Sequence, residues 1–137
     1  MGAGDSESLS VTICCNGLDA VHRTVSSTHA FSEACGLQEK QAARLAIVVE
    51  ELVFNLVEHG GVDEQGVIEL VLTRQDGVVS IALSDTGVAF DLRDAHPEEV
   101  IPDRGGGAGI DLVRAWADIV DYGSHGGRNR LILKMRL

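Results

Sequence analysis

Positive charge is scarce in this sequence. Its 137 residues carry 11 Lys and Arg against 21 Asp and Glu, which gives a net charge of -10. Nucleic acids and anionic membranes attract basic surfaces, so this balance argues against both as partners. An acidic surface instead fits a protein of the cytosol, or one that docks on a basic partner.

Paired cysteines and long apolar runs are also missing. The chain has three cysteines, at Cys14, Cys15 and Cys35, and no C-x-x-C motif. Their odd number argues against a disulfide framework and favours a reducing compartment. No apolar run reaches the roughly 18 residues of a membrane-spanning helix. The first seven residues lack the basic and apolar regions of a signal peptide. We therefore expect a cytoplasmic protein with a disordered N-terminus (1–7) and one domain (8–137).

The hydrophobic pattern predicts an α+β domain. Strands are expected at 8–14, 66–74, 78–84, 118–123 and 129–137, and helices at about 17–35, 38–58 and 109–117. Gly36 is expected to stop the first helix, and a long loop is expected at 86–108. Asp76-Gly77 predicts a hairpin, because glycine accepts a positive φ there. This order predicts a two-layer α/β sandwich, with helices on one face of a mixed, mainly antiparallel sheet.

Polar side chains interrupt the second predicted helix. Residues 45–57 spell LAIVVEELVFNLV, in which all but Glu50, Glu51 and Asn55 are apolar. A carboxylate in a poorly solvated site costs several kcal/mol unless it is paired or hydrogen-bonded. Glu51 and Asn55 lie four residues apart, and His59 continues the spacing, so the three share one helix face.

This polar stripe predicts a contact with a nucleotide and its metal. An Asn amide oxygen suits Mg²⁺, and a neighbouring Glu can accept a proton from an attacking hydroxyl. The alternative is a solvated groove edge, in which Glu50 and Glu51 pair with Lys40 or Arg44.

The end of the strand at 78–84 carries a second polar motif. It is Asp85-Thr86-Gly87, in a D-x-G-x-x-F-D pattern that includes Phe90. An Asp in this position can accept a hydrogen bond from an exocyclic amine, and Gly87 lets the backbone approach a flat ring. An ordinary turn after the strand is the alternative.

Glycines precede the third predicted helix. Residues 104–109 spell RGGGAG, and backbone N–H groups that open a helix attract phosphate. A dinucleotide-binding fingerprint is excluded, because the preceding residues 96–102, HPEEVIP, form no strand. A P-loop is excluded too, since no Gly-Lys-Ser/Thr follows. A flexible loop without a ligand is the remaining alternative.

In this order the three motifs, E-x-x-x-N-x-x-x-H, D-x-G-x-x-F-D and G-G-x-G, resemble the GHKL (Bergerat-fold) ATPase superfamily. Gyrase, Hsp90, histidine kinases and the mismatch-repair ATPase share this fold. Within the superfamily, the chain is most similar to the anti-sigma factor serine-protein kinases. The resemblance covers residues 8–137 and includes the ending Gly127-Arg128-Asn129-Arg130-Leu131.

The resemblance implies a site for ATP and Mg²⁺. Glu51 would be the general base for a partner's serine hydroxyl, and Asn55 would hold Mg²⁺. Asp85 would bind the adenine amine, with Gly87 beside the ring. Residues 92–106 would form a lid. The other expected cofactor-binding residues are His59, Phe90, Arg104, Gly105, Gly106, Gly107, Ala108, Gly109 and Ile110, with Arg104 reaching the γ-phosphate.

The resemblance also implies partners. Members are typically homodimers that bind a sigma factor in one state and phosphorylate a small anti-anti-sigma (STAS) protein in another. One alternative is an ATP-binding module that sequesters a regulatory partner and phosphorylates nothing. Another is a detached histidine-kinase catalytic domain, but those usually lack the Glu four residues before the Asn. The acidic charge disfavours a DNA-processing ATPase.

Two positions depart from the family pattern. Many members carry a Thr in the last strand near the adenine site, whereas this strand has Leu131-Ile132-Leu133. Ala108 stands where a larger apolar residue is common. The first departure implies that the polar network around Asp85 differs from that of its relatives.

Overall fold

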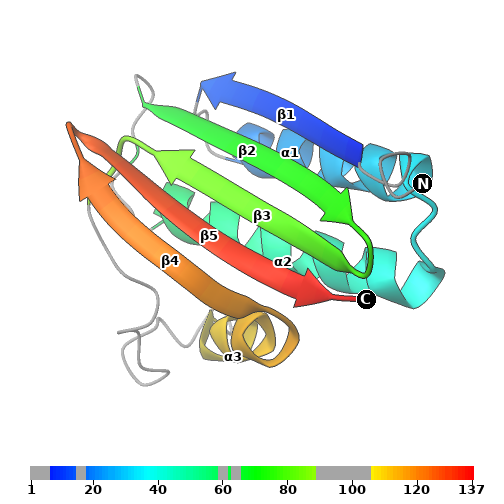
Figure 1. Cartoon of the computed structure of the whole chain (residues 1–137). Coiled ribbons are helices and arrows are strands. Elements are labelled where there is room, and N and C mark those ends of the chain that lie inside the picture. The colour runs from blue at the N-terminus through cyan, green and yellow to red at the C-terminus, as the bar shows by residue number, and fades with distance from the viewer. Residues whose placement is uncertain (1–6, 15–17, 59–61, 63–65, 89–105) are drawn as a thin grey trace.

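The computed structural model describes residues 7–14, 18–58, 62, 66–88 and 106–137. In these segments three helices cover one face of a five-stranded sheet (Figure 1). The elements are β1 (Glu7–Cys14), α1 (Leu18–Ala34), α2 (Glu39–Glu58), β2 (Val67–Gln75), β3 (Val78–Asp85), α3 (Gly106–Trp116), β4 (Asp118–His125) and β5 (Arg128–Arg136). The predicted α+β sandwich is confirmed. Residues 1–6 of the expected disordered N-terminus lie outside the described part.

The strands lie in the order β1-β2-β3-β5-β4. Every neighbouring pair among these described strands is antiparallel. β5 therefore lies between β3 and β4, although α3 and β4 separate it from β3 in the sequence. The register places Asp85, the last residue of β3, opposite Asn129, the second residue of β5. Two polar residues thus meet at one edge of the core.

The core fills the space between the sheet and α2. Along β3, the buried Val79, Ile81 and Leu83 alternate with half-buried side chains, as expected for a strand with one covered face. The helix α2 packs between α1 and α3 and buries six residues of its own: Leu45, Ala46, Val48, Val49, Leu52 and Val53. This central position explains why the helix is apolar on most sides.

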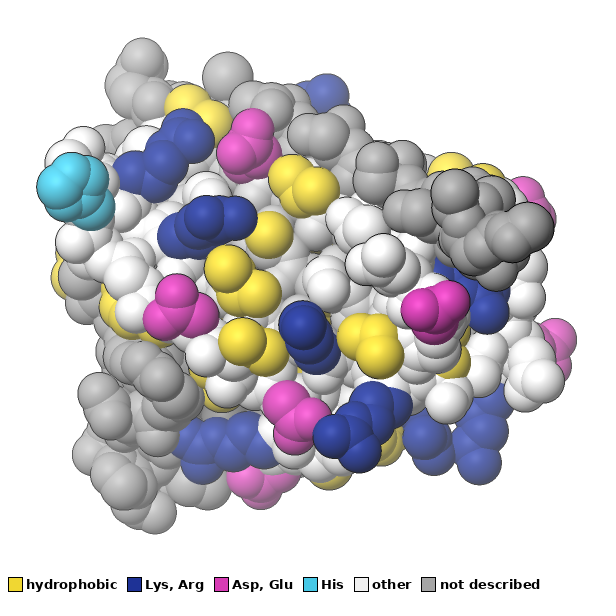
Figure 2. All heavy atoms as spheres, in the orientation of Figure 1, with side chains coloured by type: hydrophobic (Ala, Val, Ile, Leu, Met, Phe, Trp, Pro, Cys, Tyr) yellow, Lys and Arg dark blue, Asp and Glu magenta, His cyan; other side chains and the backbone are white. Residues whose placement is uncertain are grey.

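The other face of the sheet is turned to the viewer in Figure 2, where hydrophobic and charged side chains are interspersed. The solvent-exposed cations of β5 are Arg128, Arg130, Lys134 and Arg136. Arg128 lies 3.7 Å from Glu69 of β2, and both side chains are well exposed. Exposed pairs of this kind contribute about 0–1 kcal/mol, so this ion pair adds little to stability.

The end of α1 is fixed by both glycine and arginine. Gly36 has φ +67°, as its prediction as a helix stop requires, and its N–H donates to Glu33 O while Leu37 N–H donates to Ser32 O. The last turn of α1 has no basic residue of its own. Arg74 of β2 places a positive charge at this helix end, where its Nη1 donates a hydrogen bond to Cys35 O. A cation at this end stabilises the helix dipole.

Two predictions of local geometry were wrong. The first hairpin forms as expected, but its positive φ of 57° falls on Asp76 and not on Gly77. Asp is one of the residues that tolerate this conformation, so the turn closes without help from glycine. In the second hairpin, by contrast, two glycines do adopt positive φ: Gly126 (+62°) and Gly127 (+78°). The second wrong prediction concerns α3, which begins at Gly106 and not near Gly109.

Candidate functional site

The candidate site lies at one end of the molecule, where several elements converge. Figure 1 shows the end of β3, the start of β5 and the C-terminal half of α2 at the same end of the sandwich. Asp85 is 6% exposed and Asn129 is 2% exposed, so both polar side chains are buried. A buried carboxylate needs hydrogen-bond donors, and the local structure provides them.

Oδ1 of Asp85 accepts two hydrogen bonds. Gly87 N–H donates from 2.8 Å, which closes a tight turn after the strand, and Asn129 Nδ2 donates from 3.0 Å. The same Asn129 amide donates to Gly87 O at 2.9 Å. Oδ2 of Asp85 accepts no hydrogen bond from the residues that the structure describes. One oxygen therefore fixes the carboxylate, and the other is available to a donor on a ligand.

Thr86 joins this turn to the neighbouring strand. Its Oγ1 accepts a hydrogen bond from Val67 N–H at 3.0 Å. Val67 is the first residue of β2, so the bond fastens the segment after β3 to the sheet. The Asp85–Gly87 turn is thus held from both sides, by the hydrogen bond from Val67 of β2 to Thr86 and by those from Asn129 of β5.

Glu51 and Asn55 lie on α2, one turn apart, and both are half-buried. Asn55 Nδ2 donates to Glu51 O at 2.8 Å. Only the amide nitrogen can donate to a carbonyl, so this bond fixes which way the amide faces. Among the described residues, Oδ1 of Asn55 receives no donor. It therefore presents the kind of oxygen ligand that Mg²⁺ takes.

The alternative pairing of Glu50 and Glu51 with Lys40 or Arg44 does not occur. Arg44 lies over the ring of Trp116, with 5.3 Å between its guanidinium carbon and the ring centroid. In the described segments neither Lys40 nor Arg44 forms an ion pair. The acids of α2 are thus not explained by a salt bridge along their own helix.

The start of α3 has the properties of an anion-binding helix end. The first backbone N–H groups of a helix have no partner within it, and here they belong to Gly106, Gly107 and Ala108. The first turn contains no acidic residue, so no side chain of that turn cancels the positive end of the helix dipole. The earlier start of α3 places these glycines inside the first turn. Gly109 and Ile110 follow in the same helix.

Four expected site residues lie outside the described part of the chain. They are His59, Phe90, Arg104 and Gly105. Most of the expected lid at 92–106 lies outside it as well. Within the described residues, no three His, Cys, Asp or Glu side chains cluster around a common point where a metal could bind. A metal that is mostly held by phosphates and water, with one amide ligand, fits this composition.

Asn129 is the site residue that the sequence-based analysis missed. The sequence did contain a signal for it, because the alternation along β5 places Asn129 on the same face as Leu131 and Leu133. A polar residue in that register, opposite the end of an apolar strand, should have indicated a buried hydrogen-bond network. The strand β5 lacks the Thr that many family members carry near the adenine site. In this chain the amide of Asn129, on the same strand, donates a hydrogen bond to Asp85.

An α+β sandwich with a buried Asp at a strand end and a glycine-opened helix has the features of a nucleotide-binding domain. The sequence model of the histidine kinase-like ATPase domain matches residues 16–135. This chain therefore belongs to the family of histidine kinase-like ATPase domains, which is of the GHKL type. Binding of ATP follows from that membership.

Solved structures agree with the fold. The histidine kinase domain of the Erythrobacter litoralis EL346 blue-light activated histidine kinase is 18% identical, with a TM-score of 0.55. The match covers 92% of this chain and 64% of that one. For another structure of the same kinase, the values are 17% identity, TM-score 0.59, and 87% and 41% coverage. This chain thus spans less than two thirds of either structure.

A chain of the SiaB–SiaC complex from Pseudomonas aeruginosa is similar over nearly its whole length. It is 13% identical with a TM-score of 0.57, and the match covers 94% of this chain and 89% of that one. Among curated proteins, no sequence matches this chain. At these identities the structural similarity establishes the fold alone. In the part of the chain that the structure describes, no helix has the length and apolar character needed to cross a membrane.

Proposed function

We propose that this chain is an ATP-dependent protein serine kinase of the anti-sigma type. It would phosphorylate a small anti-anti-sigma (STAS) protein in the cytoplasm. The observation that carries this proposal is the Glu51–Asn55 pair on α2. One residue of the pair presents an oxygen suited to Mg²⁺, and the other is a carboxylate one helical turn away.

Each residue has a distinct role in this proposal. Oδ2 of Asp85 accepts a hydrogen bond from the adenine amine, and the turn at Gly87 lies beside the ring. The first N–H groups of α3 hold phosphate oxygens. Oδ1 of Asn55 would hold the Mg²⁺, which would neutralise charge on the phosphates when bound. Catalysis of phosphoryl transfer depends mostly on such positioning and charge stabilisation.

Glu51 acts on the partner's serine. Its carboxylate takes the hydroxyl proton while the serine oxygen forms a bond to the γ-phosphorus and the bond to the ADP oxygen breaks. ADP leaves with the bonding electrons. Because Oε2 of Glu51 is buried, this base is partly protected from water. Removing such a base typically lowers the rate by about 10²–10⁴-fold.

Glu51→Gln tests this role, and Glu50→Gln is its matched control. The two residues are neighbours and lose the same charge, but Glu50 is exposed and Glu51 is half-buried. After co-purification with the partner and incubation with Mg²⁺-ATP, mass spectrometry should find one phosphate on a partner serine. Glu51→Gln should lose about 10²-fold or more in rate and still bind ATP, whereas Glu50→Gln should stay within about twofold. Full transfer by Glu51→Gln would contradict the assignment.

The non-catalytic alternative is a module that binds ATP and sequesters a regulatory partner. The SiaB–SiaC complex supports a protein partner for this fold, and that similarity fits both functions. A partner that co-purifies with the wild-type chain and never gains phosphoserine would favour the module. The family resemblance also leads us to expect a homodimer, which light scattering of the purified chain would reveal.

A further inference from the structure

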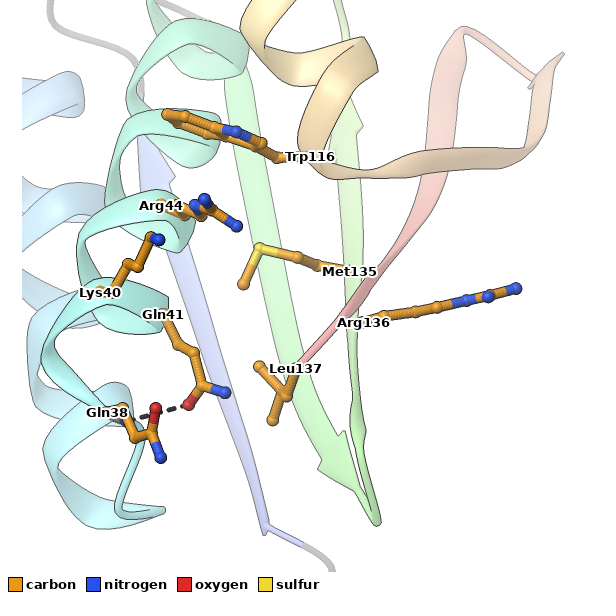
Figure 3. Close-up of a pocket in the computed structure, with 8 residues that line it drawn as sticks. All are labelled: Gln38, Lys40, Gln41, Arg44, Trp116, Met135, Arg136 and Leu137. Carbon is orange, nitrogen blue, oxygen red and sulfur yellow. Dashed lines mark hydrogen bonds between the residues drawn. The ribbon is translucent and has the colours of Figure 1, made fainter.

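A cavity lies at the end of α2 opposite the candidate nucleotide site. Its volume is about 210 Å³, and it is bounded by the first turns of α2, the end of α3 and the end of β5 (Figure 3). Lys40 lines it, and with a rise of 1.5 Å per residue it lies about 22 Å along the helix from Asn55. Nothing in the proposed kinase reaction uses this cavity.

Positive charge gathers around this cavity. Lys40 and Arg44 are one turn apart on α2, and Figure 3 shows both on the side of the helix that faces the cavity. No carboxylate side chain is among the residues that line it, and the nearby Glu39 is exposed outside it. Like charges with this spacing repel each other. The chain as a whole is acidic, with a net charge of -10, yet neither of these two cations forms an ion pair in the described segments. An anion bound between Lys40 and Arg44 would therefore be stabilised by both.

The remaining walls are aromatic and apolar. The guanidinium carbon of Arg44 lies 5.3 Å from the centroid of the Trp116 ring, within the range of a cation–π contact. The buried Met135 faces the cavity together with Leu137 (Figure 3). Arg136 contributes to the lining, but its side chain extends away from the other residues in Figure 3. The cavity therefore offers two cations and, beside them, an apolar wall formed by Met135 and Leu137.

We propose that this cavity binds a small organic anion that carries a flat apolar group. Its carboxylate or phosphate contacts Lys40 and Arg44, and its ring packs on Met135 and Leu137, beside the Arg44–Trp116 contact. The lining disfavours neutral aromatic compounds, which make no ion pair with the cations. It also disfavours bare inorganic anions, which leave the apolar wall uncovered.

The single tryptophan of the chain provides the measurement, because it lines the cavity. Phenyl phosphate is titrated while Trp116 fluorescence is followed with excitation at 295 nm. Two further probes serve as controls: benzyl alcohol lacks the charged group, and inorganic phosphate lacks the aromatic ring. Phenyl phosphate should saturate with a Kd of about 1 mM or tighter, as expected for a ligand of this size. The other two probes should bind at least about tenfold more weakly.

Charge variants locate the binding. Arg44→Gln should raise the Kd for phenyl phosphate at least about tenfold, and Lys40→Gln about fivefold. Lys40 is exposed, so its variant keeps the stack on Trp116 even if Arg44→Gln disturbs it. Lys134→Gln removes the same charge from the far face of β5 and should change the Kd by less than about twofold. Absence of saturation in the wild type, or equal weakening by Lys40→Gln and Lys134→Gln, would overturn the proposal.

Discussion

Replacing Asn129 with Ala should destabilise the domain measurably. The variant loses the donor to Asp85 Oδ1 at 3.0 Å and the donor to Gly87 O at 2.9 Å. A hydrogen bond to a charged group contributes about 1.5–3 kcal/mol, and one to a neutral carbonyl about 0.5–1.5 kcal/mol. Because Asp85 is 6% exposed, water replaces the lost donor only in part. We expect the free energy of unfolding to fall by about 2–4 kcal/mol.

Urea unfolding followed by circular dichroism measures this loss. With a typical slope of about 1.5 kcal/mol per M, the midpoint should fall by about 1.3–2.7 M. Ser124→Ala is the control, because Ser124 lies opposite Asn129 on β4 but is exposed. It should change the stability by less than about 0.5 kcal/mol. If Asn129→Ala unfolds at the same urea concentration as the wild type, the network does not hold Asp85.

Two further predictions concern stability, and both are checked by the same unfolding experiment. Gly126→Ala should cost about 1–2 kcal/mol because its φ is +62°, whereas Gly77→Ala should cost little. An added Cβ meets open space at both positions, so equal effects would contradict the role of φ. Arg74→Met should cost about 1–2 kcal/mol, because it removes the side-chain donors to Cys35 O and Asp76 O. A loss below about 0.3 kcal/mol would mean that Arg74 does not stabilise the end of α1.

The sequence predicted the elements well because their patterns are local. Alternation along β2 and β3 and the apolar run of α2 each indicate one type of element, and the hairpin turns fix which strands are neighbours. The start of α3 was placed too late, because glycine lowers the intrinsic tendency to form a helix. The structure shows that the helix includes Gly106 and Gly107 all the same.

The candidate site was predictable where its motifs are contiguous. Glu51 and Asn55 share a helix, and Asp85 and Gly87 share a turn, so spacing alone suggests their relation. Asn129 was missed because its partner is 44 residues away and the contact depends on the insertion of β5 beside β3. The cavity beside Trp116 joins three elements in the same way and leaves no pattern in the sequence.

Calorimetric titration of Mg²⁺-ATP into the wild type and Asp85→Asn tests the central claim most directly. In the variant, the remaining oxygen still accepts from Gly87 and Asn129, so the fold should persist, with a lower unfolding midpoint because both bonds now go to a neutral acceptor. The new amide nitrogen would donate where the adenine amine is proposed to donate, so binding should weaken by at least about 100-fold. Saturable binding of one ATP by the wild type, lost in the folded variant, is the predicted result. No saturation by the wild type, or equal affinity in Asp85→Asn, would contradict the account.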